Sequence, residues 1–215
     1  METLLAFAAT LISLRLAGRL ASRWRARRTP EQALWAAALG AYALASAALA
    51  WGAAAGWDDR AFRAYYLFGG LLTAALLGAG SLALAGRRAA LPAVLVYSGL
   101  AVGIAVSEPL TAPVRGTGIP AAQEHLDLFP ARLLALVGNL GGTAAVVGVA
   151  LRSFRRRPLG NGLVLAGVGV AAGGSALAGL GEAGTAAFAA VAALLLYAGF
   201  AVPGGRKLKP SSGSS

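Results

Sequence analysis

The sequence predicts an all-α, polytopic membrane protein built as a bundle of seven transmembrane helices. Of its 215 residues, 58% are hydrophobic and only 13% are charged, and the mean hydropathy is +0.69. Soluble domains carry about 25% charged residues, so most of the surface of this chain is expected to face lipid. Several apolar runs reach the ~18 to 20 residues that a helix needs to cross a bilayer. The charged residues gather at the breaks between these runs.

Seven apolar segments are expected to form the helices, and together they make one domain over residues 1–205. The segments are residues 3–22, 33–56, 62–86, 89–107, 130–151, 160–181 and 184–203. Beyond this domain, residues 206–215 are polar and of low complexity, which is typical of a disordered tail or a cloning remnant.

The charges divide the breaks into two classes that alternate along the chain. The breaks after the first, third, fifth and seventh segments, counted with Arg15 and Arg19, hold 15 of the 19 Lys and Arg and one of the eight acids, a net charge of +14. The other side of the predicted membrane holds the remaining four bases, two of them just inside the third and fifth segments, and seven acids, a net charge of −3. The positive-inside rule therefore predicts an external N-terminus and a cytoplasmic C-terminus in the inner membrane.

The first segment is expected to be a retained helix. Its basic cluster follows the apolar run, the reverse of a secretory signal peptide, and Arg15 and Arg19 are expected to snorkel toward the inner interface. An RRTP sequence after the first segment and an RRRP sequence after the fifth allow a 3+1+3 arrangement of repeated helices.

Glycines at helical spacing predict close helix packing. Gly-xxx-Gly pairs occur on the fourth, fifth and sixth segments, at Gly99/Gly103, Gly138/Gly142 and Gly169/Gly173. In lipid, such small residues let helix backbones approach one another. A glycine-lined pore or hinge is the alternative interpretation.

The composition excludes several classes of site. The chain has no Cys and one His, so disulfides, thiolate metal sites and a multi-histidine zinc or haem site within one chain are excluded. The seventh segment has no Lys for a retinal. The positive charge is explained by orientation rather than by nucleic-acid binding. With no nucleophile and base at a recognisable spacing, no enzyme activity, cofactor or resident metal is expected.

The predicted ligand-binding residues are polar side chains. They recur at helical spacing on several helices and are expected to face the interior of the bundle. Such residues are costly inside a membrane segment and indicate function by default. They form an outward-facing polar vestibule in which Glu108 lies between two arginines: Arg63, Tyr66, Glu108, Arg132 and Asn139. The structural alternative is an interfacial ion pair that tethers helix ends.

The longest external loop, residues 108–129, contains the only histidine, His125, and three acids. Apolar residues recur at helical spacing across GIPAAQEHLDLF, which predicts a short amphipathic helix over about 120–128 on the outer membrane face. A metal site using His125, Asp127 and Glu108 is the less favoured interpretation, since two histidines and a carboxylate would make a more persuasive set.

Three stretches resemble a group of uncharacterised seven-helix membrane proteins of actinobacteria and related bacteria. They are RAYYLFGGLLTAALLGAG (63–80), NLGGTAAVVGVALRSFRRR (139–157) and GNGLVLAGVGVAAGGSALAGLG (160–181). The resemblance covers nearly the whole chain, but it rests on glycine-rich motifs of low specificity. It implies the membrane fold and no known activity.

Two hypotheses about function follow. In the first, the protein binds or transports a small molecule or lipid through the outward-facing vestibule. In the second, it is a non-catalytic scaffold, sensor or partner-docking module that packs through glycine-rich faces against a homologous copy or another membrane protein.

Overall fold

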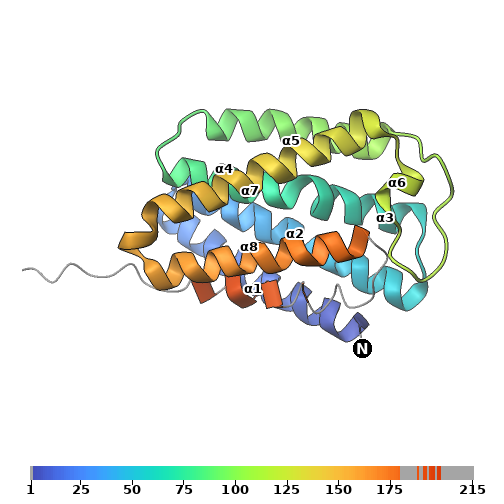
Figure 1. Ribbon diagram of the computed structural model, residues 1–215, viewed down its shortest axis with the longest axis horizontal. Coiled ribbons are helices and arrows are strands. Elements are labelled where there is room, and N and C mark those ends of the chain that lie inside the picture. Colours follow the sequence, from blue (N-terminus) through green and yellow to red (C-terminus); the bar gives the residue numbers. More distant parts are fainter. Residues whose placement is uncertain (1, 180–187, 189–190, 193, 197, 200–215) are drawn as a thin grey trace, which may run out of the picture.

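The computed structural model describes residues 2–179 and, further on, residues 188, 191–192, 194–196 and 198–199. Every regular element within these residues is helical, which confirms the all-α class (Figure 1). The α-helices are α1 (Glu2–Arg27), α2 (Pro30–Ala55), α3 (Asp59–Tyr65), α4 (Thr73–Leu84), α5 (Ala90–Ser107), α6 (Ala122–His125), α7 (Leu133–Ser153) and α8 (Pro158–Gly179). The π-helices η1 (Tyr66–Leu72) and η2 (Leu128–Arg132) lead into α4 and α7, and the 3₁₀ turn η3 (Phe154–Arg156) follows α7.

Among the described residues, four helical stretches are long and apolar enough to cross a membrane. They are Pro30–Ala55, Asp59–Leu84, Ala90–Ser107 and Leu128–Ser153, of 26, 26, 18 and 26 residues. At 1.5 Å per residue, the 26-residue stretches extend for about 39 Å, more than the ~30 Å of a bilayer core. Within the described residues, α8 provides a shorter apolar stretch, Pro158–Ala171.

The first six predicted segments all coincide with helices, and most of the seventh, 184–203, lies outside the described residues together with the predicted tail 206–215. The predicted ends of three helices are wrong. Helix α1 continues to Arg27 through the arginine cluster, α2 begins at Pro30 rather than at residue 33, and the third segment begins at Asp59 rather than at residue 62. Asp58 determines the last of these boundaries, because its Oδ1 accepts a hydrogen bond from the Ala61 backbone N–H at 2.7 Å and so caps the helix.

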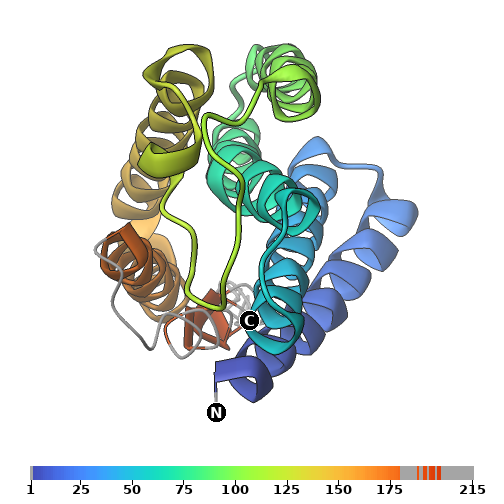
Figure 2. The same cartoon turned by 90° about the vertical axis from the view of Figure 1, so that its right-hand side faces the viewer.

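The turns that follow α1, α4 and α7 lie at one end of the molecule, and the loop that carries α6 lies at the other (Figure 1). The arginine clusters of the described residues therefore share one end, called here the basic end. The acidic loop occupies the opposite end, called here the outer end after its predicted side of the membrane. Seen from the outer end, α1 lies at the periphery beside α2, and α5 stands at the opposite margin (Figure 2).

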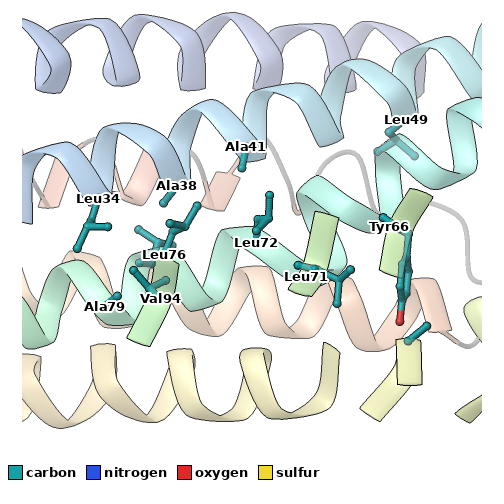
Figure 3. Close-up of a cluster of buried hydrophobic side chains, with 14 of the residues drawn as sticks. Leu34, Ala38, Ala41, Leu49, Tyr66, Leu71, Leu72, Leu76, Ala79 and Val94 are labelled. Atoms are coloured by element: carbon teal, nitrogen blue, oxygen red, sulfur yellow. The ribbon is translucent and has the colours of Figure 1, made fainter. Parts of the chain in front are cut away.

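The main core forms between α2, the η1–α4 stretch, α5 and α7. Buried leucines and alanines of α2 face η1 and α4, as Figure 3 shows for Leu34, Ala38, Leu72 and Leu76. At the basic end of this core the ring of Trp35 fills the space at Gly80, where a Cβ would lie 2.5 Å from the indole Cδ1. A smaller cluster joins Leu16 and Leu20 of α1 to α2.

Helices α4 and α7 touch through their backbones. A Cβ built on Gly78 would lie 2.5 Å from the Gly142 Cα, and one built on Gly142 would clash with the Ala74 carbonyl. Gly138, one turn from Gly142, leaves room for the Tyr97 hydroxyl. The predicted packing role of Gly138/Gly142 is therefore confirmed. A Cβ on Gly99 or Gly103 of α5 would meet no atom within 4 Å, so this pair makes no such contact in the described structure.

The loop predicted to be external, residues 108–129, is folded against the start of α3. Its helix α6 covers only Ala122–His125, so the predicted range of about 120–128 is too long. The Val114 backbone N–H donates to Asp59 Oδ1 at 3.0 Å, and the Trp57 N–H donates to the Gly116 carbonyl at 2.7 Å. These bonds fix the loop across the outer end of the bundle.

Candidate functional site

A small pocket lies at the outer end, between α3–η1, the end of α5 and the loop. Its wall is formed by Phe62, Arg63, Tyr66, Ile104, Ala105, Glu108, Leu126 and Ala131. Three of the five predicted ligand-binding residues, Arg63, Tyr66 and Glu108, are therefore brought together. The other five wall residues are apolar, and nothing in the sequence distinguishes them from the other members of their apolar stretches.

The pocket is small. Its volume is about 10 Å³, close to the ~10 to 15 Å³ that one water molecule occupies on this scale. Sites for drug-sized ligands are clefts of about 300 to 1,000 Å³. In this conformation the pocket therefore has room for a single water-sized group.

Arg63 connects α3 to the end of α5. Its Nη1 donates to the Ala105 carbonyl and its Nη2 to the Glu108 carbonyl, both at 2.7 Å. The last carbonyls of a helix have no partner within the helix and carry the negative end of its dipole. The guanidinium therefore caps α5, and it meets Glu108 through the backbone rather than through the carboxylate.

Tyr66 has the least satisfied polar group of the pocket. Its side chain is 9% exposed, and its hydroxyl is buried with no hydrogen-bond partner among the described residues. The ring stacks on Phe62, with centroids 6.0 Å apart, and the hydroxyl oxygen points away from α2 (Figure 3). A buried hydroxyl without a partner costs free energy, and groups of this kind are usually paired with water or a ligand.

The two remaining predicted residues do not form the wall of the pocket. Arg132 is the last residue of η2 and directly follows the wall residue Ala131. Asn139 is on α7 and donates through Nδ2 to the Gly70 carbonyl at 2.6 Å and to the Ala135 carbonyl at 2.9 Å. The structure thus pairs Asn139 with η1.

The π-helix η1 accounts for this role of Asn139. A π-helix shifts the hydrogen-bonding pattern within the α3–α4 stretch and leaves carbonyls that other groups must satisfy. Thr73 Oγ1 donates to the Phe68 carbonyl at 2.7 Å, Asn139 bonds the Gly70 carbonyl, and the Tyr97 hydroxyl lies 3.0 Å from the Leu71 carbonyl and 3.1 Å from that of Leu134. Side chains of α5 and α7 therefore hold η1 in place. Sequence analysis missed this role of Tyr97, since a π-helix cannot be recognised in a run of apolar residues.

His125 is engaged by the loop and by α3. Its Nδ1 lies 3.2 Å from the Ala112 carbonyl, and its ring meets that of Phe62 edge-on, with centroids 5.3 Å apart. Within the described residues, no group of three or more His, Asp or Glu is arranged to hold a metal ion. The contacts of His125 support a structural role in anchoring the loop.

Comparisons with known proteins identify no relative of this chain. No family model, curated protein or solved structure matches the chain. The resemblance to uncharacterised actinobacterial membrane proteins stays a prediction.

Proposed function

We propose that this protein is a multi-pass membrane protein that binds a small polar solute in the pocket at its outer end. The observation that carries this proposal is the buried, unpartnered hydroxyl of Tyr66 in a pocket that also contains Arg63 and Glu108. A solute with one hydrogen-bonding group would satisfy that hydroxyl. Arg63 and Glu108 would orient the solute, Arg132 would add positive charge at the margin, and Asn139 would act by holding η1.

Binding is better supported than passage through the bundle. Between η1 and the basic end, the backbones of α4 and α7 are in contact at Gly78 and Gly142. This contact leaves no space for a solute between these two helices. A solute larger than water would also require the pocket to widen, either by movement of Leu126 in the loop or by loss of the bonds from Arg63 to α5.

A Tyr66→Phe substitution tests the proposed site. Without ligand, the variant is expected to melt at the same temperature as the parent protein or slightly higher, because it removes a polar group that has no partner. It is also expected to lose the rise in melting temperature given by small polar solutes. A panel of formate, formamide, glycine and glycerol, followed by differential scanning fluorimetry in detergent, provides the measurement.

Tyr97→Phe is the matched control for this experiment. It removes a hydroxyl that contacts the Leu71 and Leu134 carbonyls but keeps the Tyr66 hydroxyl. It should therefore lower the melting temperature without ligand and retain a solute-induced rise, reduced in size because Tyr97 helps to hold η1. A solute response that survives in the Tyr66 variant, or a parent protein that no solute in the panel stabilises, would contradict the proposed site.

We propose that the bundle has seven transmembrane helices, with the N-terminus outside and the C-terminus in the cytoplasm, and that a 3+1+3 repeat underlies it. The charge asymmetry of +14 against −3, from 15 bases with one acid and four bases with seven acids, supports this orientation in the inner membrane. The position of the arginine-bearing turns at one end of the molecule agrees with it.

The orientation can be tested by labelling single cysteines, since the chain has none of its own. Thr117→Cys, in the outer loop, is expected to react with a membrane-impermeant maleimide in intact cells. Ala89→Cys, in the turn between α4 and α5, should react only after permeabilisation. The opposite pattern would invert the proposed topology, and reaction of both residues from outside would contradict a crossing between them.

A further inference from the structure

Helix α1 has two faces of different character. It packs on α2 through the buried residues Ala9, Ser13, Leu16 and Leu20. The outward face is apolar over its first half, where four large side chains are between 50 and 71% exposed: Leu4, Phe7, Leu11 and Leu14. From Arg15 onward the same face carries exposed Arg15, Gly18, Arg19 and Ser22.

Contacts with α2 place Arg15 near the middle of the bundle. Leu16 and Leu20 form one cluster with Leu39, and Trp35 packs against it. With antiparallel helices, Arg15 is then about level with Ala41, which is roughly 16 Å from the start of α2 and roughly 21 Å from its end at 1.5 Å per residue. Trp35 in turn contacts Gly80, so the basic end of α4 is level with the start of α2. Arg15 therefore lies near half the height of the span.

A guanidinium at this depth is poorly suited to face lipid. Arginine keeps its charge under all physiological conditions, and a charge near the bilayer centre is costly unless it is paired or reaches water. Helical side chains incline toward the N-terminus, which for α1 is away from the basic end. The predicted snorkelling would therefore have to run against this inclination and over a distance that a three-carbon stem does not bridge.

The described part of the chain offers Arg15 no carboxylate. No hydrogen bond or ion pair involves it among the described residues, and the described acids belong to helix ends, the turn between α2 and α3 and the outer loop: Glu2, Glu31, Asp58, Asp59, Glu108, Glu124 and Asp127. A second copy would bring the same acids at the same heights, so it would not place one of these beside Arg15 at mid-depth.

The surface next to Arg15 is open to a close approach. A Cβ built on Gly18 would meet no atom within 4 Å, and Ser22 Oγ is turned back to the Gly18 carbonyl at 3.0 Å. Small residues four apart allow a second helix to come near the backbone. This lets a partner bring a short acidic side chain to the guanidinium.

We propose that the outward face of α1 is a docking surface for a transmembrane helix of another membrane protein, one that carries an Asp or Glu near mid-membrane and pairs it with Arg15. The inference rests on the proposed membrane orientation, in which α1 crosses the bilayer. Charge complementarity identifies the partner: the exposed, mid-depth arginine requires an anion there, and a membrane helix is the structure that can hold a carboxylate at that depth.

A model peptide provides a direct test. A lysine-flanked polyleucine helix with one central Asp, and a matched peptide with Leu at that position, are titrated against the full chain in phosphatidylcholine vesicles. The chain bears a donor fluorophore on a single introduced cysteine, Thr3→Cys, and energy transfer to the peptide reports binding. The Asp peptide is expected to bind at least tenfold more tightly than the Leu peptide.

Two variants distinguish the role of Arg15 from a general effect of charge. Arg15→Leu should abolish the tenfold difference and keep the melting temperature, because the side chain is exposed. Arg23→Leu, two turns nearer the basic end of the same helix, should retain the difference. Equal binding of the two peptides, or an Arg15→Leu protein that still distinguishes them, would overturn the proposal.

Two further outcomes would assign the surface to other occupants and also overturn the proposal. One is self-association of the chain without peptide that Arg15→Leu abolishes, which points to a second copy. The other is a tenfold difference that disappears when phosphatidylglycerol is added, which points to lipid phosphate. Labelling of Thr3→Cys and an Arg28→Cys variant from the same side would show that α1 does not cross the bilayer, and would overturn this inference without affecting the Tyr66 pocket.

Discussion

Replacement of Gly142 by leucine is expected to destabilise the protein by about 3 kcal/mol or more, enough to prevent accumulation of folded protein. Even the first atom of the new side chain would clash with the Ala74 carbonyl, and the opposite wall of the contact is backbone at Gly78. Neither neighbour is a flexible side chain that can rotate away. Relief therefore requires α4 and α7 to separate, which exposes the core that they share with η1 and α2.

Gly141→Leu is the matched control for this prediction. Gly141 is adjacent in sequence, exposed, and has no atom within 4 Å of a built Cβ, so the same substitution should not lower the stability and can raise it by up to about 1 kcal/mol through helix propensity. Unfolding in mixed detergent micelles, followed by circular dichroism, measures both variants. If Gly142→Leu and Gly141→Leu unfold at the same detergent fraction, the backbone contact between α4 and α7 is wrong.

Gly-xxx-Gly pairs predict where a close helix approach is possible, but they do not predict the partner helix. The motif states that a close approach is allowed on one helix face, and it says nothing about which helix approaches. Gly138/Gly142 meet Tyr97 and α4, whereas Gly99/Gly103, with the same spacing, meet no atom within 4 Å. A partner is determined by the connectivity of the whole bundle, which no local pattern contains.

Helix positions could be predicted because the thickness of the bilayer sets a length for apolar runs. Helix ends were harder to predict, since hydropathy does not determine them. Arginine is a good helix former, so α1 continues through its basic cluster to Arg27. Capping by Asp58 starts α3 before the apolar run begins. In the loop, the buried position of Leu126 and its extended backbone end α6 after one turn.

The candidate site was predicted only in part, for a physical reason. Arg63, Tyr66 and Glu108 meet because two of them are one turn apart on a helix and the third ends α5 beside them. Asn139 shares the polar character of these residues, but its partner is the backbone of η1. Side-chain polarity indicates that a buried residue needs a partner, and a carbonyl released by a π-helix satisfies that need as well as a ligand does.

Asn139→Leu is expected to lower the free energy of unfolding by about 1 to 2 kcal/mol in the absence of any ligand. The substitution leaves the Gly70 carbonyl of η1 without its side-chain donor, and lipid cannot replace that bond. Ser107→Ala is the control, because its exposed hydroxyl bonds only the Gly103 carbonyl of its own helix and should change the stability by less than about 0.5 kcal/mol.

Combining Asn139→Leu with Tyr97→Phe separates the structural role of Asn139 from a direct ligand contact. Both residues donate to adjacent carbonyls of η1, those of Gly70 and Leu71, so their effects on ligand-free stability should be non-additive. Once one bond is lost, the π-helix relaxes and the second bond contributes less. Unfolding of the two single variants and the double variant in mixed micelles gives the coupling energy. A ligand-binding asparagine would behave differently: the Asn139 variant would keep its ligand-free stability, the coupling would be zero, and only the response to solute would be lost.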